Sequence, residues 1–359
     1  MKIGIMRRNQ YYLIAVIALA LIVLVLFLTN SKTTFRHSMS DFAVDDTSNI
    51  TMIFMSDKNN NTLKLTRKLP GYAWVVNEKY LGQKFNIDML METMLNVEVK
   101  HPVPLAAHNN VIKELAANSV KVEIYQWVYR IELFGVRWFP HEKLTKVYYV
   151  GGATQDNQGN FMLMEHSSEP FVTYLPGLRG FISPRFTPIE KYWRDYSVFK
   201  KNLREIASVK IEFPSFPDQS FEIINKYQQS LELISLTDHT RNTGFDTLKV
   251  LNFLSAFRNL SFEALLNDLD KNYKDSIISS VPFAIITLTD TSGYVNSVKT
   301  FHKKAAAGAT DYNGKPVQYD LDRAYALVNG GKDFTLIQFF VFDKVLRPKK
   351  FFLKGFKEE

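Results

Sequence analysis

The chain has no cysteine among its 359 residues. This absence excludes disulfides, thiolate-bound metals and a lipid-modified cysteine, so the fold must rest on core packing. Histidine is also scarce: there are seven, and none has a second histidine at the three-to-five-residue spacing of a helical or finger-type metal pair. We therefore predict no cofactor and no metal site.

Acidic residues are absent from the first 40 positions, and the first one is Asp41. Those 40 residues carry five basic side chains, so the formal charge of +8 falls to +3 over residues 41–359, where 39 basic residues face 36 acidic ones. A protein that follows a phosphate backbone needs a concentrated basic surface. The near-neutral remainder of the chain therefore predicts no nucleic-acid partner.

One long apolar run is present, over residues 13–28, and it carries no charge. Extended to residues 11–29, it is long enough for a helix that crosses a bilayer core of about 30 Å, and Lys2, Arg7 and Arg8 favour an N-terminus on the inside. We expect an uncleaved single-pass signal anchor in a bacterial inner membrane, with a cytoplasmic N-terminus and a periplasmic or extracytoplasmic C-terminal domain. A cleaved signal peptide is the alternative, but the run has no small-x-small cleavage site.

Two stretches of the chain match each other at an offset of about 156 to 160 residues, which predicts a tandem repeat. Each copy begins with the apolar–polar alternation of a strand, followed by a polar turn and a second alternating stretch. Each copy is therefore expected to open with a hairpin. The apolar positions of its first strand are Ile50, Ile53 and Met55 in one copy and Ile206, Val209 and Ile211 in the other.

A helix is expected next in each copy, with Asn86 or Asp246 as its N-cap. Its apolar residues are spaced three and four apart, so they form one stripe that faces a sheet. A ligand groove is the alternative interpretation of this stripe, and core is the prediction. The stripe comprises Leu90, Met91, Met94 and Val97 in the first copy and Val250, Leu251, Leu254 and Phe257 in the second.

The second half of each copy contains the tripeptide Gly-Ala-Thr, which begins at Gly152 and at Gly308. We expect the two glycines at equivalent turns, followed by equivalent strands over residues 170–175 and 324–328. Strands, a helix and further strands in each copy indicate an α+β order and not the strict alternation of a parallel sheet.

The predicted fold is therefore α+β, with an N-terminal transmembrane helix followed by a tandem duplication of antiparallel sheet plus helix units. Pro184 and Pro188 interrupt regular structure and mark the boundary between the copies. The expected segments are a cytoplasmic N-terminus at 1–10, a transmembrane helix at 11–29, a stalk at 30–40, a first α+β repeat at 41–190, a linker at 191–202 and a second α+β repeat at 203–359.

Two short motifs resemble parts of catalytic or phosphate-binding sites, but each is incomplete. Ser197 and Lys200 have the Ser-x-x-Lys spacing of penicillin-recognising enzymes without the two companion motifs. The stretch from Gly308 to Pro316 has the wrong spacing for a phosphate-binding loop and a proline where a hydroxyl would bind magnesium. The sequence therefore assigns no catalytic, cofactor-binding or metal-binding residue.

Trp193, Arg194 and Asp195 are the residues that we single out as a partner or interdomain contact. An arginine–aspartate pair beside a large aromatic residue can clamp a partner or join two domains. In the favoured interpretation, Trp193 packs between the repeats, while Arg194 and Asp195 satisfy buried or capping polar groups. A ligand site is the alternative.

Several short motifs occur in an order that resembles a known family. They are Asp41-Phe-Ala-Val-Asp-Asp-Thr47, Trp74-Val-Val-Asn77, Tyr149-Val-Gly-Gly-Ala-Thr-Gln-Asp156 and Trp193-Arg-Asp195. Together with the expected anchor, they resemble the bacterial membrane-anchored family catalogued as domain of unknown function 4340, from about Asp41 to beyond residue 260. That family has no established activity, and the resemblance implies an accessory role beside ABC-type membrane transporters or gliding-motility-like proteins.

These observations predict a membrane-anchored extracytoplasmic binding or scaffold protein that is not an enzyme and is accessory to a transporter or an envelope complex. Its partners would be the membrane, through residues 11–29, and a membrane protein complex. Two alternatives stay open. One is an extracytoplasmic enzyme whose site is formed by residues distant in sequence, and the other is a cell-wall polysaccharide binder with exposed Trp and Tyr residues in a row on one face.

Overall fold

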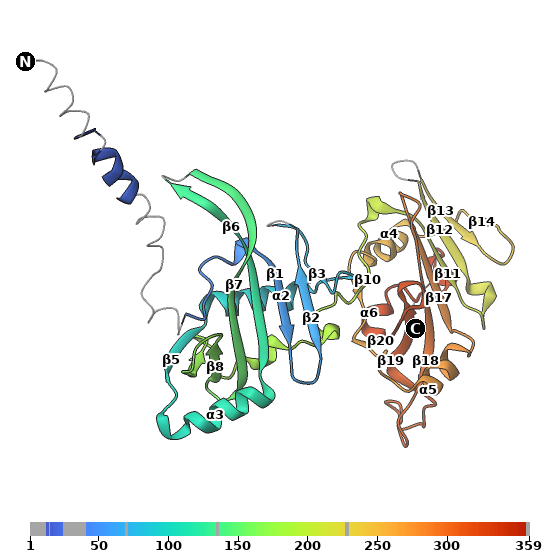
Figure 1. Cartoon of the computed structure of the whole chain (residues 1–359). Helices are drawn as coiled ribbons and strands as arrows, with labels where there is room; N and C mark the ends of the chain where they lie inside the picture. Colours follow the sequence, from blue (N-terminus) through green and yellow to red (C-terminus); the bar gives the residue numbers. More distant parts are fainter. Residues whose placement is uncertain are drawn as a thin grey trace, which may run out of the picture. The chain divides into compact units, whose positions relative to one another are not determined.

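The chain divides into two compact units, Met1–Asp195 and Tyr196–Glu359, which we call unit 1 and unit 2. The division falls inside the stretch 191–202, where the sequence predicts a linker. Each unit is built around an antiparallel sheet. The computed structural model, drawn in Figure 1, describes residues 12–13, 15–23, 41–68, 71–133, 136–226 and 230–356.

The transmembrane helix expected over residues 11–29 is a wrong prediction. The structure describes residues 12–13 and 15–23 of this segment as helical, and no helix among the described residues is long and apolar enough to cross a membrane. A helix of nine residues rises about 14 Å, against about 30 Å for a bilayer core. The single-pass anchor, the inner-membrane localisation and the orientation that depended on this helix are corrected with it. Residues 1–10 and 30–40 lie outside the described residues.

The sheet of unit 1 has nine strands in the order β4-β3-β2-β1-β6-β7-β8-β9-β5. Successive side chains of a strand point to opposite faces, so the apolar residues alternate. In β1, Ile53 and Met55 are buried, and Phe54 between them is partly exposed. The strands are β1 (Ile50–Ser56), β2 (Thr62–Thr66), β3 (Val75–Val76), β4 (Tyr80–Leu81), β5 (Glu98–Pro102), β6 (Val120–Leu133), β7 (Val136–Ala153), β8 (Asn160–Met164) and β9 (Phe171–Tyr174).

Helices α2 (Lys84–Asn96) and α3 (Leu105–Asn118) pack on opposite faces of this sheet. Adjacent residues of β9 show the division, because Phe171 joins the main core under α2 and Val172 joins a smaller cluster under α3. The stripe predicted for the first helix therefore faces a sheet. The buried residues of the two helices are Ile87, Leu90, Thr93 and Met94 in α2 and Val111 and Leu115 in α3.

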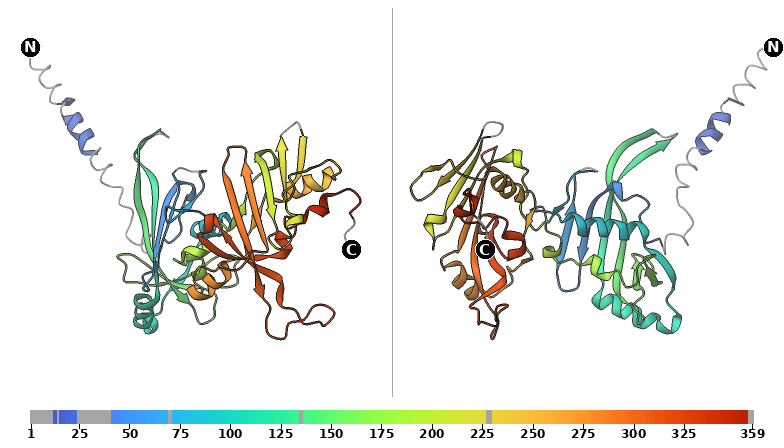
Figure 2. Two further views of the ribbon diagram at one scale, coloured as in Figure 1. Left: turned by 90° about the vertical axis from the view of Figure 1, so that its right-hand side faces the viewer. Right: turned by 180° about the vertical axis from the view of Figure 1, so that it is seen from behind.

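Strands β6 and β7 extend beyond the rest of the sheet of unit 1, as Figures 1 and 2 show. Strand β1 pairs with β6 as far as Gln126, and β8 pairs with β7 only from Tyr148 onward. We call residues 127–142 the β-arm. Within the described residues, its two strands pair with each other and with no further strand.

Unit 2 contains a second nine-stranded antiparallel sheet, in the order β14-β13-β12-β11-β17-β18-β19-β20-β16. Helix α4 (Thr247–Ala256) packs on its main core, and α5 (Lys271–Ile278) lies against a smaller cluster that includes Phe301. The strands are β11 (Ile206–Glu212), β12 (Phe221–Lys226), β13 (Ser230–Ser235), β14 (Arg241–Asn242), β16 (Ala264–Leu265), β17 (Ala284–Asp290), β18 (Val295–Lys304), β19 (Tyr319–Val328) and β20 (Asp333–Gln338), with β10 (Ser197–Phe199) and β15 (Leu260–Ser261) paired separately.

The two sheets have the same strand order, with β11 to β14 in the places of β1 to β4 and β17 to β20 in the places of β6 to β9. An irregularity is repeated as well. The pairing of β1 with β6 shifts register between Ile50 and Met52, and the pairing of β11 with β17 shifts between Ile206 and Ser208. Bulges are designed features that persist among related sheets. The shared order and the shared bulge are what a tandem duplication produces.

Two details of the expected repeat are wrong. Gly152 is the penultimate residue of β7, whereas Gly308 lies in the loop after β18 with a φ of 78°. Residues 170–175 contain β9, which corresponds to β20, while residues 324–328 belong to β19. The Gly-Ala-Thr match therefore does not mark an equivalent turn, because the loop that contains Gly308 is longer than the turn after β7.

Each unit ends in a short segment that packs over its first helix. We call residues 189–195 of unit 1 and residues 348–354 of unit 2 the closing straps. Each strap places one aromatic side chain in the core of its unit, Trp193 in unit 1 and Phe352 in unit 2. The straps are therefore parts of the two cores.

Hydrogen bonds at the start of the helices show that the straps are equivalent. The N-cap of α2 is Gln83 and not Asn86 as predicted, whereas Asp246 is the N-cap of α4 as predicted. The backbone N–H of Gln83 donates to the carbonyl oxygen of Trp193, and that of Asp246 donates to the carbonyl oxygen of Phe352, both at 2.7 Å. These bonds align α2 with α4 at an offset of 163 residues, about one helical turn from the offset of 160 in the sequence.

Candidate functional site

Trp193 lies in the core of unit 1. The residue is 2% exposed, and its indole Nε1 donates a hydrogen bond to the carbonyl oxygen of Thr187 at 2.8 Å. A buried indole N–H usually has such a partner, because an unpaired one is costly to desolvate. Trp193 is therefore a structural residue of the closing strap, and one edge of it also lines a surface groove.

Arg194 is buried against β4. Its guanidinium carbon lies 3.6 Å from the centroid of the Tyr80 ring, and its Nη1 lies 3.8 Å from Glu190 Oε1. Stacking on an aromatic face and pairing with a carboxylate both stabilise a buried guanidinium. Asp195 follows, and its backbone N–H donates to the carbonyl oxygen of Leu81 at 2.8 Å. These contacts lie within unit 1 and hold the strap against β4.

The groove beside Trp193 has a volume of about 640 Å³ and lies between α2 and the chain that follows β9. Helix α2 contributes Met89 from its partly exposed face, opposite the buried stripe. The rest of the lining comes from the irregular segment 178–193. Its apolar lining residues are Met89, Leu178, Phe181, Ile189, Tyr192 and Trp193.

Large apolar side chains surround the opening of the groove. Phe181 is 40% exposed and Tyr192 is 48% exposed. Phe85 is 72% exposed and lies one helical turn before Met89, on the same side of α2. Exposed apolar side chains that cluster in one place, and do not occur singly, mark a surface for interaction.

Arg185 is the one charged residue in the described lining of the groove. Its Nη1 donates to Thr93 Oγ1 at 2.8 Å, and the Thr93 hydroxyl in turn donates to the carbonyl oxygen of Met89 at 2.7 Å. A guanidinium has five N–H donors, and no carboxylate in the part of the chain that the structure describes pairs with Arg185. The groove therefore presents a positive charge that lacks a counter-ion.

A second cavity, of about 580 Å³, lies beside α3 on the other side of the sheet. Its rim is polar and includes charges of both signs, with Lys100 Nζ 3.8 Å from Asp156 Oδ2. The hydroxyl of Thr154 donates to Asp156, which is the main cause that lowers the pKa of this carboxyl. No group of three or more His, Asp or Glu side chains among the described residues could hold a metal ion. This rim compensates its own charges, unlike the groove beside Trp193.

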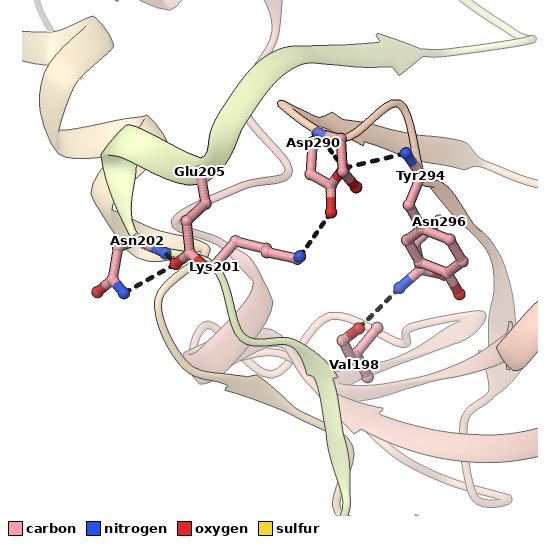
Figure 3. Close-up of polar contacts among 8 residues, drawn as sticks. Val198, Lys201, Asn202, Glu205, Asp290, Tyr294 and Asn296 are labelled. Carbon is pink, nitrogen blue, oxygen red and sulfur yellow. Dashed lines mark hydrogen bonds and ion pairs between the residues drawn. The ribbon is translucent and has the colours of Figure 1, made fainter.

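Unit 2 contains a tightly paired cluster of charges at the turn between β17 and β18, shown in Figure 3. Lys201 Nζ lies 2.6 Å from Asp290 Oδ2. The other carboxylate oxygen of Asp290 accepts hydrogen bonds from the backbone N–H groups of Ser292 and Tyr294, at 2.9 and 3.0 Å. The hydrogen bond from Lys201 is the main cause that lowers the pKa of Asp290 far below its usual value.

The partners of this cluster are structural. Asn202 and Glu205 form a capping box on the 3-10 turn that precedes β11, and Asn296 Nδ2 donates to the carbonyl oxygen of Val198 at 2.9 Å (Figure 3). A carboxylate whose pKa is far below neutrality is a poor general base at neutral pH. The cluster therefore joins the chain ahead of β11 to the β17–β18 turn.

The two motifs that resembled catalytic elements do not form sites. Strand β10 is extended, so Lys200 does not lie one helical turn from Ser197. The stretch from Gly308 to Pro316 leads into strand β19, whereas a phosphate-binding loop opens a helix. The Asp311 carboxylate accepts backbone N–H bonds within this stretch, which is the behaviour of a turn.

No family model, curated protein or solved structure matches the chain. The resemblance to the family catalogued as domain of unknown function 4340 therefore stays a prediction. A fold by itself does not determine a function, so the function is argued from the groove and its residues.

Sequence reasoning identified one residue of the groove, Trp193, and missed the others. Phe181 and its neighbours lie in an irregular segment with no apolar period that would reveal a shared face. Arg185 was missed because its role depends on which residues surround it in space. Pro184 and Pro188 were a signal of irregular chain here, but they were interpreted only as a boundary.

Proposed function

We propose that the protein is a non-enzymatic binding or scaffold protein that holds a polypeptide partner in the groove of unit 1. The observation that carries this proposal is the groove itself, which is apolar, open to the surface and lined by Trp193 and Tyr192. Aromatic residues in the core of an interface contribute most of the binding energy of many complexes. The groove supplies such residues on a rigid sheet and helix.

The composition of the lining supports binding and not a reaction. An enzyme, which the sequence left as an alternative, needs a nucleophile or an acid–base pair at its site. The ionisable side chains of the described lining are Arg185 and Tyr192, and neither has a carboxylate or histidine in the lining to activate it.

The proposal is tested by selecting random peptides from a display library on the full chain. Met89→Lys is the blocking variant, because it places an ammonium group on the partly exposed face of α2 that lines the groove. Phe216→Lys is the matched control, since Phe216 is an exposed apolar residue of unit 2. Thermal melts confirm that both variants are folded.

We expect peptides that bind the wild type and Phe216→Lys and that bind Met89→Lys at least about tenfold more weakly, which corresponds to about 1.4 kcal/mol. A selection that yields no peptide, or only peptides that bind Met89→Lys equally well, would overturn the proposal.

Binding to a cell-wall polysaccharide is a second candidate, which the β-arm favours. Tyr129 pairs with Pro140 and Ile131 pairs with Trp138, so the two aromatic rings are diagonal neighbours on one face of the ribbon. Both are exposed. Sedimentation with insoluble cell wall should retain the wild type but not a Tyr129→Ser/Trp138→Ser variant, and equal retention of the two would exclude this candidate.

A further inference from the structure

Unit 2 fills the surface beside its first helix with its own chain. Lys249 of α4 donates from Nζ to the carbonyl oxygens of Phe351 and Phe356, both at 3.1 Å. Its ammonium lies 4.8 Å from the centroid of the Phe351 ring and 5.4 Å from that of Phe356. The two rings meet edge to face with centroids 6.3 Å apart. An aromatic residue on a short segment after the strap therefore covers α4.

The equivalent surface of unit 1 is where the groove lies. At the offset of 163 residues, Asn86 of α2 takes the place of Lys249, and Asn86 Nδ2 donates to the carbonyl oxygen of Tyr192 at 2.6 Å. Tyr192 in turn takes the place of Phe351, because each immediately precedes the buried aromatic residue of its strap. Asn86 and Tyr192 both line the groove.

Unit 1 has no counterpart of Phe356 at this place. The position equivalent to Phe356 along the chain is Ser197, which belongs to β10 of unit 2. The ring that covers the first helix in unit 2 is thus replaced in unit 1 by an open volume with apolar walls. A polypeptide segment that carries an aromatic residue would restore the arrangement of unit 2.

Charge adds a second requirement on the occupant. Arg185 lines the groove with a single hydrogen-bond partner, the hydroxyl of Thr93. A carboxylate is the group that matches the fork of a guanidinium best, because it accepts two parallel N–H bonds. In a largely apolar groove, this pairing also compensates a charge that is partly removed from water.

We propose that the groove of unit 1 recognises a segment of a partner polypeptide in which an aromatic residue is followed by an acidic one. The aromatic ring enters beside Tyr192, as the Phe356 ring does beside Phe351 in unit 2, and the carboxylate pairs with Arg185. This inference rests on the proposed function and specifies the chemistry of the partner.

The test measures fluorescence anisotropy of labelled peptides on the full chain. The peptides are acetylated and amidated Gly-Ser sequences that differ only in a central Phe-Glu, Phe-Gln or Ala-Glu pair. For the wild type, we expect Phe-Glu to bind at least about tenfold more tightly than Ala-Glu, because the ring is lost, and about fivefold more tightly than Phe-Gln, because the charge is lost.

Variants of Arg185 isolate the charge. In Arg185→Gln, Phe-Glu and Phe-Gln should bind equally, whereas Arg185→Lys should keep a preference for Phe-Glu. Arg258→Gln, which removes an exposed arginine of unit 2, is the matched control and should behave as the wild type. Thermal melts of each variant establish that it is folded, and the comparison of Phe-Glu with Phe-Gln on one variant does not depend on its stability.

Two results would overturn the inference. One is equal binding of Phe-Glu and Ala-Glu to the wild type, and the other is a Glu-over-Gln preference that persists in Arg185→Gln. Display peptides that depend on Met89 but contain no aromatic–acidic pair would overturn this inference and leave the binding function intact. A display selection without any groove-dependent peptide would overturn both.

Discussion

Unit 1 and unit 2 contain nine strands in the same order, the same bulge and the same closing strap, but their surfaces differ in two places. Beside the first helix, unit 1 has a groove, whereas unit 2 places Phe351 and Phe356 over Lys249. At the central hairpin, unit 1 has strands of 14 and 18 residues and unit 2 has strands of 7 and 10. Both differences leave more apolar surface exposed on unit 1, which makes unit 1 the stronger candidate for recognition.

The shared part of the comparison is broken most directly at the straps. Trp193→Ala and Phe352→Ala should each lower the free energy of unfolding by about 3–5 kcal/mol, because each removes a large buried side chain and leaves a cavity. Denaturant unfolding of the full chain measures both, with the fully exposed Tyr312→Ala as the control. A loss below about 1 kcal/mol for either strap variant would show that the two straps are not equivalent.

A charge cluster of unit 2 gives the next effect. The pKa of Asp290 is lowered, chiefly by Lys201, so its carboxylate stabilises the fold at a pH above the unfolded value of about 3.9, and this stabilisation is lost as the pH falls toward the lower folded value. Asp290→Asn should therefore lower Tm at pH 7, and its difference from the wild type should narrow from about pH 5 to pH 2. The exposed Asp88→Asn is the control. A difference in Tm that is constant with pH would contradict this.

Shortening the β-arm sharpens the comparison, because it makes the hairpin of unit 1 resemble that of unit 2. Replacing residues 128–141 by a two-residue Asn-Gly turn should change the free energy of unfolding by less than about 1 kcal/mol, since a two-stranded ribbon buries little and is only marginally stable by itself. Denaturant unfolding checks this. A loss above about 3 kcal/mol would mean that the arm packs as part of the core.

The smallest effect is expected at the opening of the groove. Phe85→Ser and Phe181→Ser should leave the free energy of unfolding within about 0.5 kcal/mol of the wild type, because both side chains are largely exposed. Peptide binding should weaken in the same variants. A clear loss of stability would assign these residues to the core and remove them from the recognition surface.

The sequence predicted the strands well and the helix register less well. Ile53 and Val209 lie on equivalent strands because alternating burial imposes a period of two that a repeat preserves. The apolar stripes of α2 and α4 repeat every three and four residues, so a shift of one turn still places apolar residues on apolar ones. The hydrogen bonds from Gln83 and Asp246 to the straps decide the register, and no sequence pattern encodes them.

The straps and the groove were beyond the sequence for a different reason. Trp193 and Phe352 occupy the same place at an offset of 159 residues, but their neighbours differ, so no match reveals them. The groove depends on Arg185 and Phe181, whose importance comes from the surrounding chain. The transmembrane helix was predicted from hydropathy alone and was wrong on the described residues.

The closing strap of unit 1 has a consequence for the order of events during synthesis. All nine strands of unit 1 lie before residue 175, whereas Trp193 is made about 20 residues later. A growing chain that ends at residue 188 holds the complete sheet but lacks the aromatic residue that completes its core. Domains generally fold one after another as they leave the ribosome, and here the first domain reaches its final packing just as the first residues of the second are added.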